Sequence, residues 1–117
     1  MHKITIKETS NPLIIKFELE EFIVKNQSFE FKNIDETKNS PLAQQLFYLP
    51  FVKTVYISGN FIAIERFSIV EWKDVQEEVA EQIENFISSG GVIIKIEENS
   101  TKKIPVSIYA ENTPNPA

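Results

Sequence analysis

Cysteine is absent from all 117 residues of this chain. Without thiols, the chain can form neither a disulfide framework nor a zinc or iron–sulfur site held by its own thiolates. Histidine is almost absent too, because the one histidine, His2, lies at the N-terminus, where chain ends are usually poorly ordered. We therefore expect no catalytic residues, no metal ligands and no cofactor in this chain.

Long apolar runs and an excess of positive charge are also missing. No apolar stretch approaches the ~20 residues of a membrane-spanning helix, and the opening MHKITIKETS lacks the apolar core of a signal peptide. We therefore expect a cytoplasmic protein. The net charge is −5, whereas binding to nucleic-acid phosphates or to an anionic membrane surface is favoured by positive charge. Neither nucleic acid nor a membrane is expected as a partner.

The remaining composition is that of a folded domain. Apolar residues make up 42% of the chain and charged residues 25%, and nine residues are phenylalanine. These proportions are typical of globular proteins, and the length suffices for one domain with a single core.

A capped helix is predicted to begin after Ser40. The Ser40 hydroxyl can accept hydrogen bonds from the free N–H groups of the first turn, and Pro41 suits the first helical position. Pro50 cannot continue the helix. One face of this helix is apolar and consists of Leu42, Leu46, Phe47 and Leu49.

A β-hairpin follows, with Gly59-Asn60 as its two-residue turn. Closing this turn opposes Ile57 to Ile62. The next pair on the same side of the ribbon is Val55 and Ile64. We assign these four side chains to the core.

The other side of the hairpin carries Tyr56, Phe61 and Ala63. An antiparallel sheet commonly packs helices on one face and leaves the other face wetter. These three residues therefore form a candidate partner-binding face. The alternative is that segments before residue 40 or after residue 91 cover them.

Further strands and a second helix complete the predicted fold. Alternating or continuous apolar residues predict strands over 2–7, 13–17, 28–31, 92–97 and 104–109. The second helix begins with Trp72, and its apolar stripe consists of Trp72, Val75, Val79, Ile83, Phe86 and Ile87. We predict a two-layer α+β domain, with a mostly antiparallel sheet and two main helices packed on one face.

Acidic residues occupy the opposite face of this second helix: Glu77, Glu78, Glu81 and Glu84. A small hydrolase would need two carboxylates held together in a pocket, with pKa values that differ. Carboxylates on the polar face of an amphipathic helix are ordinarily solvated, so the hydrolase is the weaker alternative.

The end of the chain resembles its beginning. Near the start, Ile4-Thr5-Ile6 is followed by the segment Thr9 to Pro12. The same order recurs near the end, where Val106-Ser107-Ile108 is followed by Thr113 to Pro116, and the spacing between the two parts differs by two residues. We predict a domain over residues 1–88, a connector over 89–103 and the truncated start of a second copy over 104–117. The alternative is a chance recurrence of two strands, each followed by Asn-Pro.

The order of motifs supports a family resemblance. An Asn-Pro segment leads to LIIKF, and then come SPLAQQLF, VKTVYI, GNFIAIER and the helix that begins with tryptophan. This order resembles the N-terminal domain of Nfu/NifU-like iron–sulfur scaffold proteins over about residues 4–88. The motif positions expected to be structural are Asn11, Pro12, Ser40, Pro41, Phe47, Gly59, Asn60 and Trp72.

The resemblance implies a function without catalysis. In this family a separate C-terminal domain with a Cys-x-x-Cys motif holds the cluster. The longer protein to which this chain would belong, its parent protein, is therefore expected to carry an iron–sulfur cluster. This chain would be an accessory recognition module, not an enzyme. Its partners would be iron–sulfur apo-proteins, assembly factors and the parent's own C-terminal domain. The alternative is an interaction domain unrelated to iron–sulfur assembly.

Overall fold

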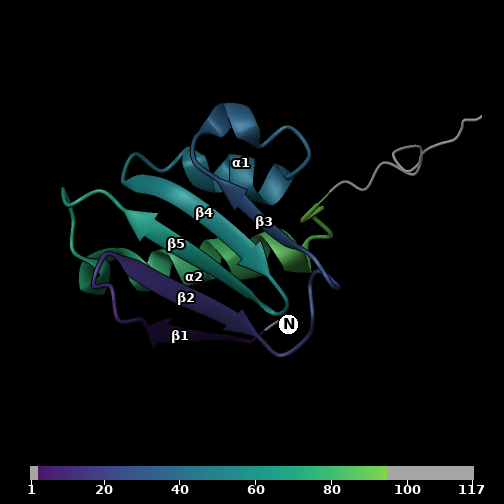
Figure 1. Ribbon diagram of the computed structural model, residues 1–117. Helices are drawn as coiled ribbons and strands as arrows, with labels where there is room; N and C mark the ends of the chain where they lie inside the picture. The colour runs from purple at the N-terminus through teal and green to yellow at the C-terminus, as the bar shows by residue number, and fades with distance from the viewer. Residues whose placement is uncertain (1–2, 95–117) are drawn as a thin grey trace, which may run out of the picture.

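The computed structural model describes residues 3–94 of the chain. Five strands form one sheet in the order β1-β2-β5-β4-β3, and every neighbouring pair is antiparallel (Figure 1). The elements in chain order are β1 (Ile4–Glu8), β2 (Ile14–Leu19), β3 (Ser28–Phe31), the short 3-10 helix η1 (Ile34–Glu36), α1 (Pro41–Phe47), β4 (Val52–Ser58), β5 (Phe61–Arg66) and α2 (Trp72–Ser88).

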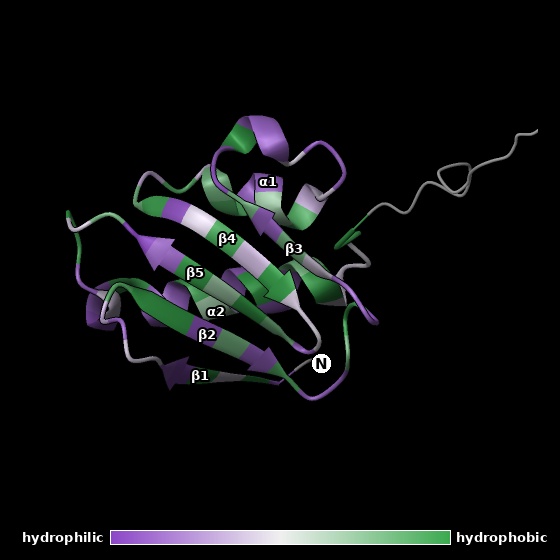
Figure 2. Ribbon diagram, in the orientation of Figure 1, coloured by the Kyte–Doolittle hydropathy of each residue, from purple (hydrophilic) through white to green (hydrophobic). Residues whose placement is uncertain are grey.

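The predicted α+β class is confirmed. One core cluster joins the sheet to both helices, with Leu42 and Leu46 from α1 and Val79 and Ile83 from α2. Hydrophobic and hydrophilic residues alternate along the strands, so each strand has one side for the core and one for solvent (Figure 2).

The β4–β5 hairpin has the predicted register. Ile57 lies opposite Ile62 and Val55 opposite Ile64, and all four side chains are fully buried. Gly59 has a φ of +54°, a left-handed conformation that glycine adopts without steric cost.

The same turn anchors the chain after β2. The Asn60 carbonyl accepts from the Leu19 N–H at 2.7 Å, and the Asn60 side-chain amide donates to the Leu19 carbonyl at 2.9 Å. The Gly59 carbonyl accepts from the N–H groups of Ile23 at 2.8 Å and Val24 at 3.2 Å. The hairpin turn therefore fixes the segment that leads toward β3.

Ser40 caps α1 and also binds the segment after α2. Its Oγ accepts from the Ala43 N–H at 3.1 Å, as predicted for an N-cap. The same hydroxyl donates to the Ile93 carbonyl at 2.7 Å, and the Ser40 side chain is fully buried.

The predicted strand over 92–97 is wrong for its described part, because residues 92–94 are not in a strand. The Gly91 N–H bonds back to the Phe86 carbonyl at 2.9 Å, and the Ile93 carbonyl binds Ser40 instead of a neighbouring strand. Ile93 and Ile94 pack against the core cluster. Residues 95–117 lie outside the described residues. The rest of the predicted connector, the strand over 104–109 and the second copy therefore stay predictions.

Replacing Ser40 by alanine should lower the free energy of unfolding by about 1–2 kcal/mol, because the Ala43 N–H loses its cap and the Ile93 carbonyl loses its donor. Urea denaturation measures this loss. Ser68→Ala, in an exposed turn, is the control and should change stability by less than about 0.5 kcal/mol. Equal losses in the two variants would show that the buried Ser40 hydroxyl contributes no more to stability than an exposed serine hydroxyl.

Candidate functional site

The structure brings Tyr56, Phe61 and Ala63 together on the sheet face away from the helices. Tyr56 lies directly across from Ala63, and the Tyr56 and Phe61 rings have centroids 6.0 Å apart with planes tilted by 35°. Tyr56 is 37% exposed, and Phe61 and Ala63 are half-buried. Their place on the fold agrees with the expected pattern, and their binding role stays a prediction.

Strands before residue 40 extend this face and do not cover it. β2 pairs with β5, and β3 pairs with β4, so both lie in the same layer (Figure 1). This pairing places Lys16 opposite Ala63, with its Nζ 4.3 Å from the centroid of the Phe61 ring. Such a distance is typical of a cation–π interaction. We call Lys16, Tyr56, Phe61 and Ala63 the open face.

Sequence reasoning missed Lys16 as part of this face. The alternation in β2 indicates that Lys16 points away from the core, but only the pairing of β2 with β5 places it beside Phe61. That pairing joins segments more than 40 residues apart, and no local signal in the sequence predicts it.

Ion pairs flank the open face. Lys7 Nζ lies 2.9 Å from a Glu18 carboxylate oxygen, and Lys53 Nζ lies 3.7 Å from a Glu65 carboxylate oxygen. The hydrogen bond from Lys7 is the largest cause that lowers the pKa of Glu18. Desolvation opposes the lowering, and the charges of Lys7 and Lys16 add smaller contributions that lower the pKa. The surface around the aromatic pair is therefore polar, and these lysines and glutamates form ion pairs with each other.

Lys7→Met should raise the pKa of Glu18 toward its ordinary value, because the largest cause of the lowering is removed. A lowered native pKa stabilises the fold above the ordinary carboxyl pKa, and this contribution is lost as pH falls through the lowered value. An NMR titration of the Glu18 carboxyl carbon measures the change. Lys53→Met, which removes the other pair, should leave the Glu18 titration in place. An unchanged pKa in Lys7→Met would disprove the assignment.

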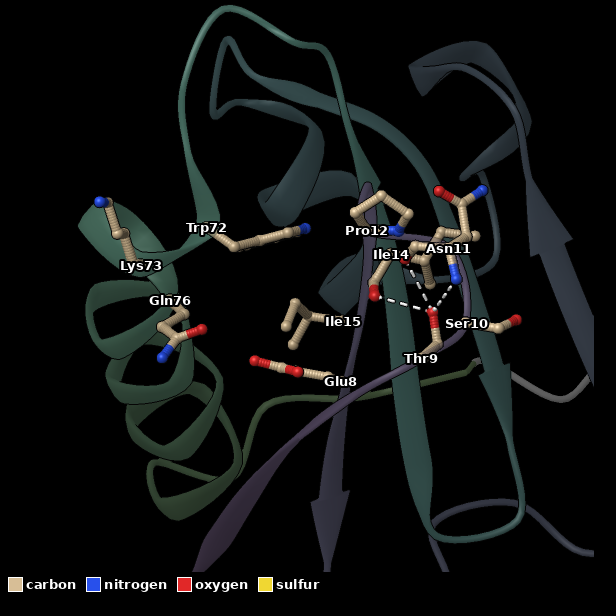
Figure 3. A pocket seen from close by; sticks show the side chains of 10 residues that line it. All are labelled: Glu8, Thr9, Ser10, Asn11, Pro12, Ile14, Ile15, Trp72, Lys73 and Gln76. Atoms are coloured by element: carbon tan, nitrogen blue, oxygen red, sulfur yellow. Dashed lines mark hydrogen bonds between the residues drawn. The ribbon is translucent and has the colours of Figure 1, made fainter.

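A second candidate region is the turn between β1 and β2 (Figure 3). The Asn11 side-chain oxygen accepts from the Leu13 N–H at 2.9 Å, and the Asn11 N–H donates to the Thr9 hydroxyl at 3.2 Å. The Ile14 N–H donates to the Asn11 carbonyl at 2.9 Å. Asn11 thus builds an Asx-type turn, for which its short amide side chain is well suited.

Trp72 connects this turn to the start of α2. Its indole N–H donates to the Leu13 carbonyl at 2.7 Å, and its ring makes edge contacts with Phe17 and Phe51 at centroid distances of 5.8 and 6.1 Å. Trp72 is 5% exposed, so it belongs to the core, as its place in the apolar stripe predicted.

Asn11, Pro12 and Trp72 line one cavity of about 330 Å³, although about 60 residues separate them in the chain (Figure 3). Glu8 contributes the only carboxylate of this lining, beside Lys73 and Gln76 from α2. General acid–base hydrolysis needs a pair of carboxylates, so this cavity does not suit it. Within residues 3–94, no group of three or more His, Cys, Asp or Glu side chains is arranged to hold a metal ion.

The other motif positions lie elsewhere. Ser40, Pro41 and Phe47 belong to the cap and body of α1, and Gly59-Asn60 forms the hairpin turn. The motif positions therefore gather at three separate places and not at one site. Their structural role stays a prediction.

Replacing Trp72 by phenylalanine should cost about 1–2 kcal/mol of stability, because the bond to Leu13 is lost while an aromatic ring remains. The Leu13 carbonyl keeps its bond from the Arg66 N–H at 3.0 Å, which limits the loss. Trp72→Leu also removes both ring contacts and should cost about 2–4 kcal/mol. Urea denaturation compares the two variants, and equal losses would contradict a role for the ring contacts.

None of the helices within residues 3–94 is long and apolar enough to cross a membrane.

Residues 3–94 form a small two-layer α+β domain, and within these residues one sheet face carries no helix. The family described as "Scaffold protein Nfu/NifU N terminal" matches residues 4–90, and this chain belongs to that family. The match confirms the resemblance that the motif order indicates.

Similar proteins support the same family. An NFU1 iron-sulfur cluster scaffold homolog, named mitochondrial, of Drosophila willistoni is 31% identical over 98 residues, which cover 83% of this chain and 34% of the relative. The solution NMR structure of a NifU-like protein from Saccharomyces cerevisiae has a TM-score of 0.72 and 27% identity, and the match covers 83% of this chain and 87% of that one. A Staphylococcus aureus crystal structure, at 22% identity and a TM-score of 0.59, shares the fold over 69% of this chain and 98% of that one.

The chain spans only about a third of the length of the Drosophila relatives it matches. The similarity therefore concerns one domain of those proteins.

Proposed function

We propose that this chain is the accessory protein-recognition module of an iron–sulfur scaffold or carrier protein. The cluster would be held by a separate C-terminal domain with a Cys-x-x-Cys motif. The observation that carries the proposal is the open face: an aromatic pair beside a lysine, on a sheet side that no helix covers within residues 3–94.

The chemistry of the chain supports a division of labour between domains. Iron–sulfur clusters are held mainly by cysteine thiolates, and this chain has no cysteine. The match to the Drosophila NFU1 homologs leaves about two thirds of those proteins outside it, which is ample length for another domain. A module of this family without thiols is suited to position partners, and we propose no catalysis for it.

The open face has the composition of a protein-binding surface. Aromatic residues are enriched at the centres of interfaces, and tyrosine is common among residues that dominate binding energy. The ion pairs at its margins resemble the polar rim of an interface, because their charges are already compensated. The proposed partners are iron–sulfur apo-proteins, assembly factors and the parent's own C-terminal domain. We propose neither nucleic acid nor a membrane as a partner.

We propose the cytoplasm as the location of this protein. The Drosophila relatives are named as mitochondrial proteins.

The proposal is tested with Tyr56→Thr/Phe61→Thr, which removes the aromatic pair but keeps residues that favour strands. The binding probes are a cysteine-ligated apo-ferredoxin and the separately produced Cys-x-x-Cys domain of the parent protein, measured by calorimetry. Wild-type chain should bind at least one probe, and the double variant should bind it about 10- to 30-fold more weakly.

The matched control is Tyr48→Thr/Phe67→Thr. It removes one tyrosine and one phenylalanine that are 67% and 45% exposed and lie outside the open face. This control should bind like wild type. Equal weakening in both double variants would reject the open face. A wild-type chain that binds neither probe would favour the alternative, an interaction domain unrelated to iron–sulfur assembly.

A further inference from the structure

β1 forms an edge of the sheet. It pairs only with β2, over the five positions Ile4 to Glu8, so its outer edge has no strand neighbour within residues 3–94. The pairing is regular, and β1 contains no proline that would block further pairing. An edge of this kind presents unpaired N–H and C=O groups, on which another strand can be added.

A groove runs beside this edge, between β1 and α2. Its volume is about 560 Å³. Ile4 and Ile6 of β1 and Ala80 of α2 give it an apolar floor, and both isoleucines are half-buried. Four carboxylates complete the lining: Glu77, Glu78, Glu81 and Glu84.

A strand added to β1 would send every second side chain toward this groove, because strand side chains alternate between faces. Those side chains would meet an apolar floor and an acidic wall together. Lysine and arginine suit such a place, because their aliphatic stems cover apolar surface while their charged ends reach carboxylates. The ion pairs found within residues 3–94 lie elsewhere, and none of them includes a carboxylate of the groove.

The same charges disfavour a second copy of the chain at this edge. Two chains that paired through β1 would bring two acidic α2 faces together, and each chain has a net charge of −5. Repulsion between these like charges disfavours the arrangement. The opposite edge, β3, is only four residues long, and α2 carboxylates do not line the cavity beside it.

We propose that the outer edge of β1 binds an extended segment of a partner protein that carries lysine or arginine at alternate positions. The partner strand pairs with Ile4 to Glu8 through its backbone and places its basic side chains in the groove against α2. This site is distinct from the open face, and the proposal does not rest on a role in iron–sulfur assembly.

The first experiment uses a blocked peptide, acetyl-Thr-Lys-Thr-Lys-Thr-Lys-Thr-amide, and the full 117-residue chain labelled with ¹⁵N. Titration should shift the backbone amides of Ile4 to Glu8 and of the α2 segment 77–84. A peptide of the same composition with its three lysines adjacent should bind more weakly, because it cannot place all of them on one side of a strand.

Backbone pairing is tested by N-methylation of the alternating peptide. Methyl groups on every second residue remove the N–H groups along one edge of a strand only. Methylation of one set should abolish binding, and methylation of the other set should preserve it. Equal binding of both methylated peptides would mean adhesion by charge alone and would overturn the proposal.

The acidic wall is tested with Glu77→Gln/Glu81→Gln/Glu84→Gln. This triple variant should bind the alternating peptide about fivefold more weakly or worse, because three ion pairs are lost. Its matched control is Glu20→Gln/Glu30→Gln/Asp35→Asn, which makes the same change in net charge at exposed positions away from the groove. The control should bind the peptide nearly as well as wild type, and equal weakening in both triple variants would reject the groove.

Three further results would overturn the proposal. Peptide-induced shifts confined to β3 or to the open face would place the binding elsewhere. Association of the chain with itself through β1, detected by sedimentation and by cross-strand NOEs, would make a second copy the occupant. NOEs between β1 and residues 101–109 of the same chain would make its own C-terminal segment the occupant.

Discussion

The register of the β4–β5 hairpin determines which side of the sheet becomes core and which becomes surface. Strand side chains alternate, so a slip by one residue would exchange the two faces. The observed register buries Ile57 and Ile62 and leaves Tyr56 and Phe61 toward solvent. β2 pairs with one side of this hairpin and β3 with the other, so their side chains also divide into a core side and a surface side. The surface chemistry of the whole domain therefore follows from one turn with a fixed length.

A second set of contacts connects α2 to the sheet at the end away from the Gly59-Asn60 turn. The Leu13 carbonyl accepts from both the Trp72 indole and the Arg66 N–H, so the end of the β1–β2 turn, the end of β5 and the start of α2 meet at one oxygen atom. Arg66 is 6% exposed, and its NH2 group lies 3.4 Å from Glu71, just before the helix. These contacts fix the position at which α2 begins its course across the sheet.

Local signals made much of this fold predictable. Ser40 followed by Pro41 marks a helix start, Gly59-Asn60 marks a tight turn, and the stripe from Trp72 fixes the buried side of α2. Contacts between distant segments were not predictable in this way. The pairing of β2 with β5 placed Lys16 over Phe61, and the hydroxyl of Ser40 holds Ile93 where alternation predicted a strand. In both cases the two residues in contact are more than 40 positions apart in the sequence.

The hairpin turn has a consequence for where the domain tolerates added sequence. Because the carbonyls of Gly59 and Asn60 hold Leu19, Ile23 and Val24, lengthening this loop would release a neighbouring segment as well as the hairpin itself. Residues 67–69 between β5 and α2 are exposed. Their hydrogen bonds are made by Phe67, whose N–H donates to the Phe51 carbonyl and whose carbonyl accepts from the Arg66 guanidinium at 3.3 Å. An epitope tag or fluorophore site belongs in that second loop.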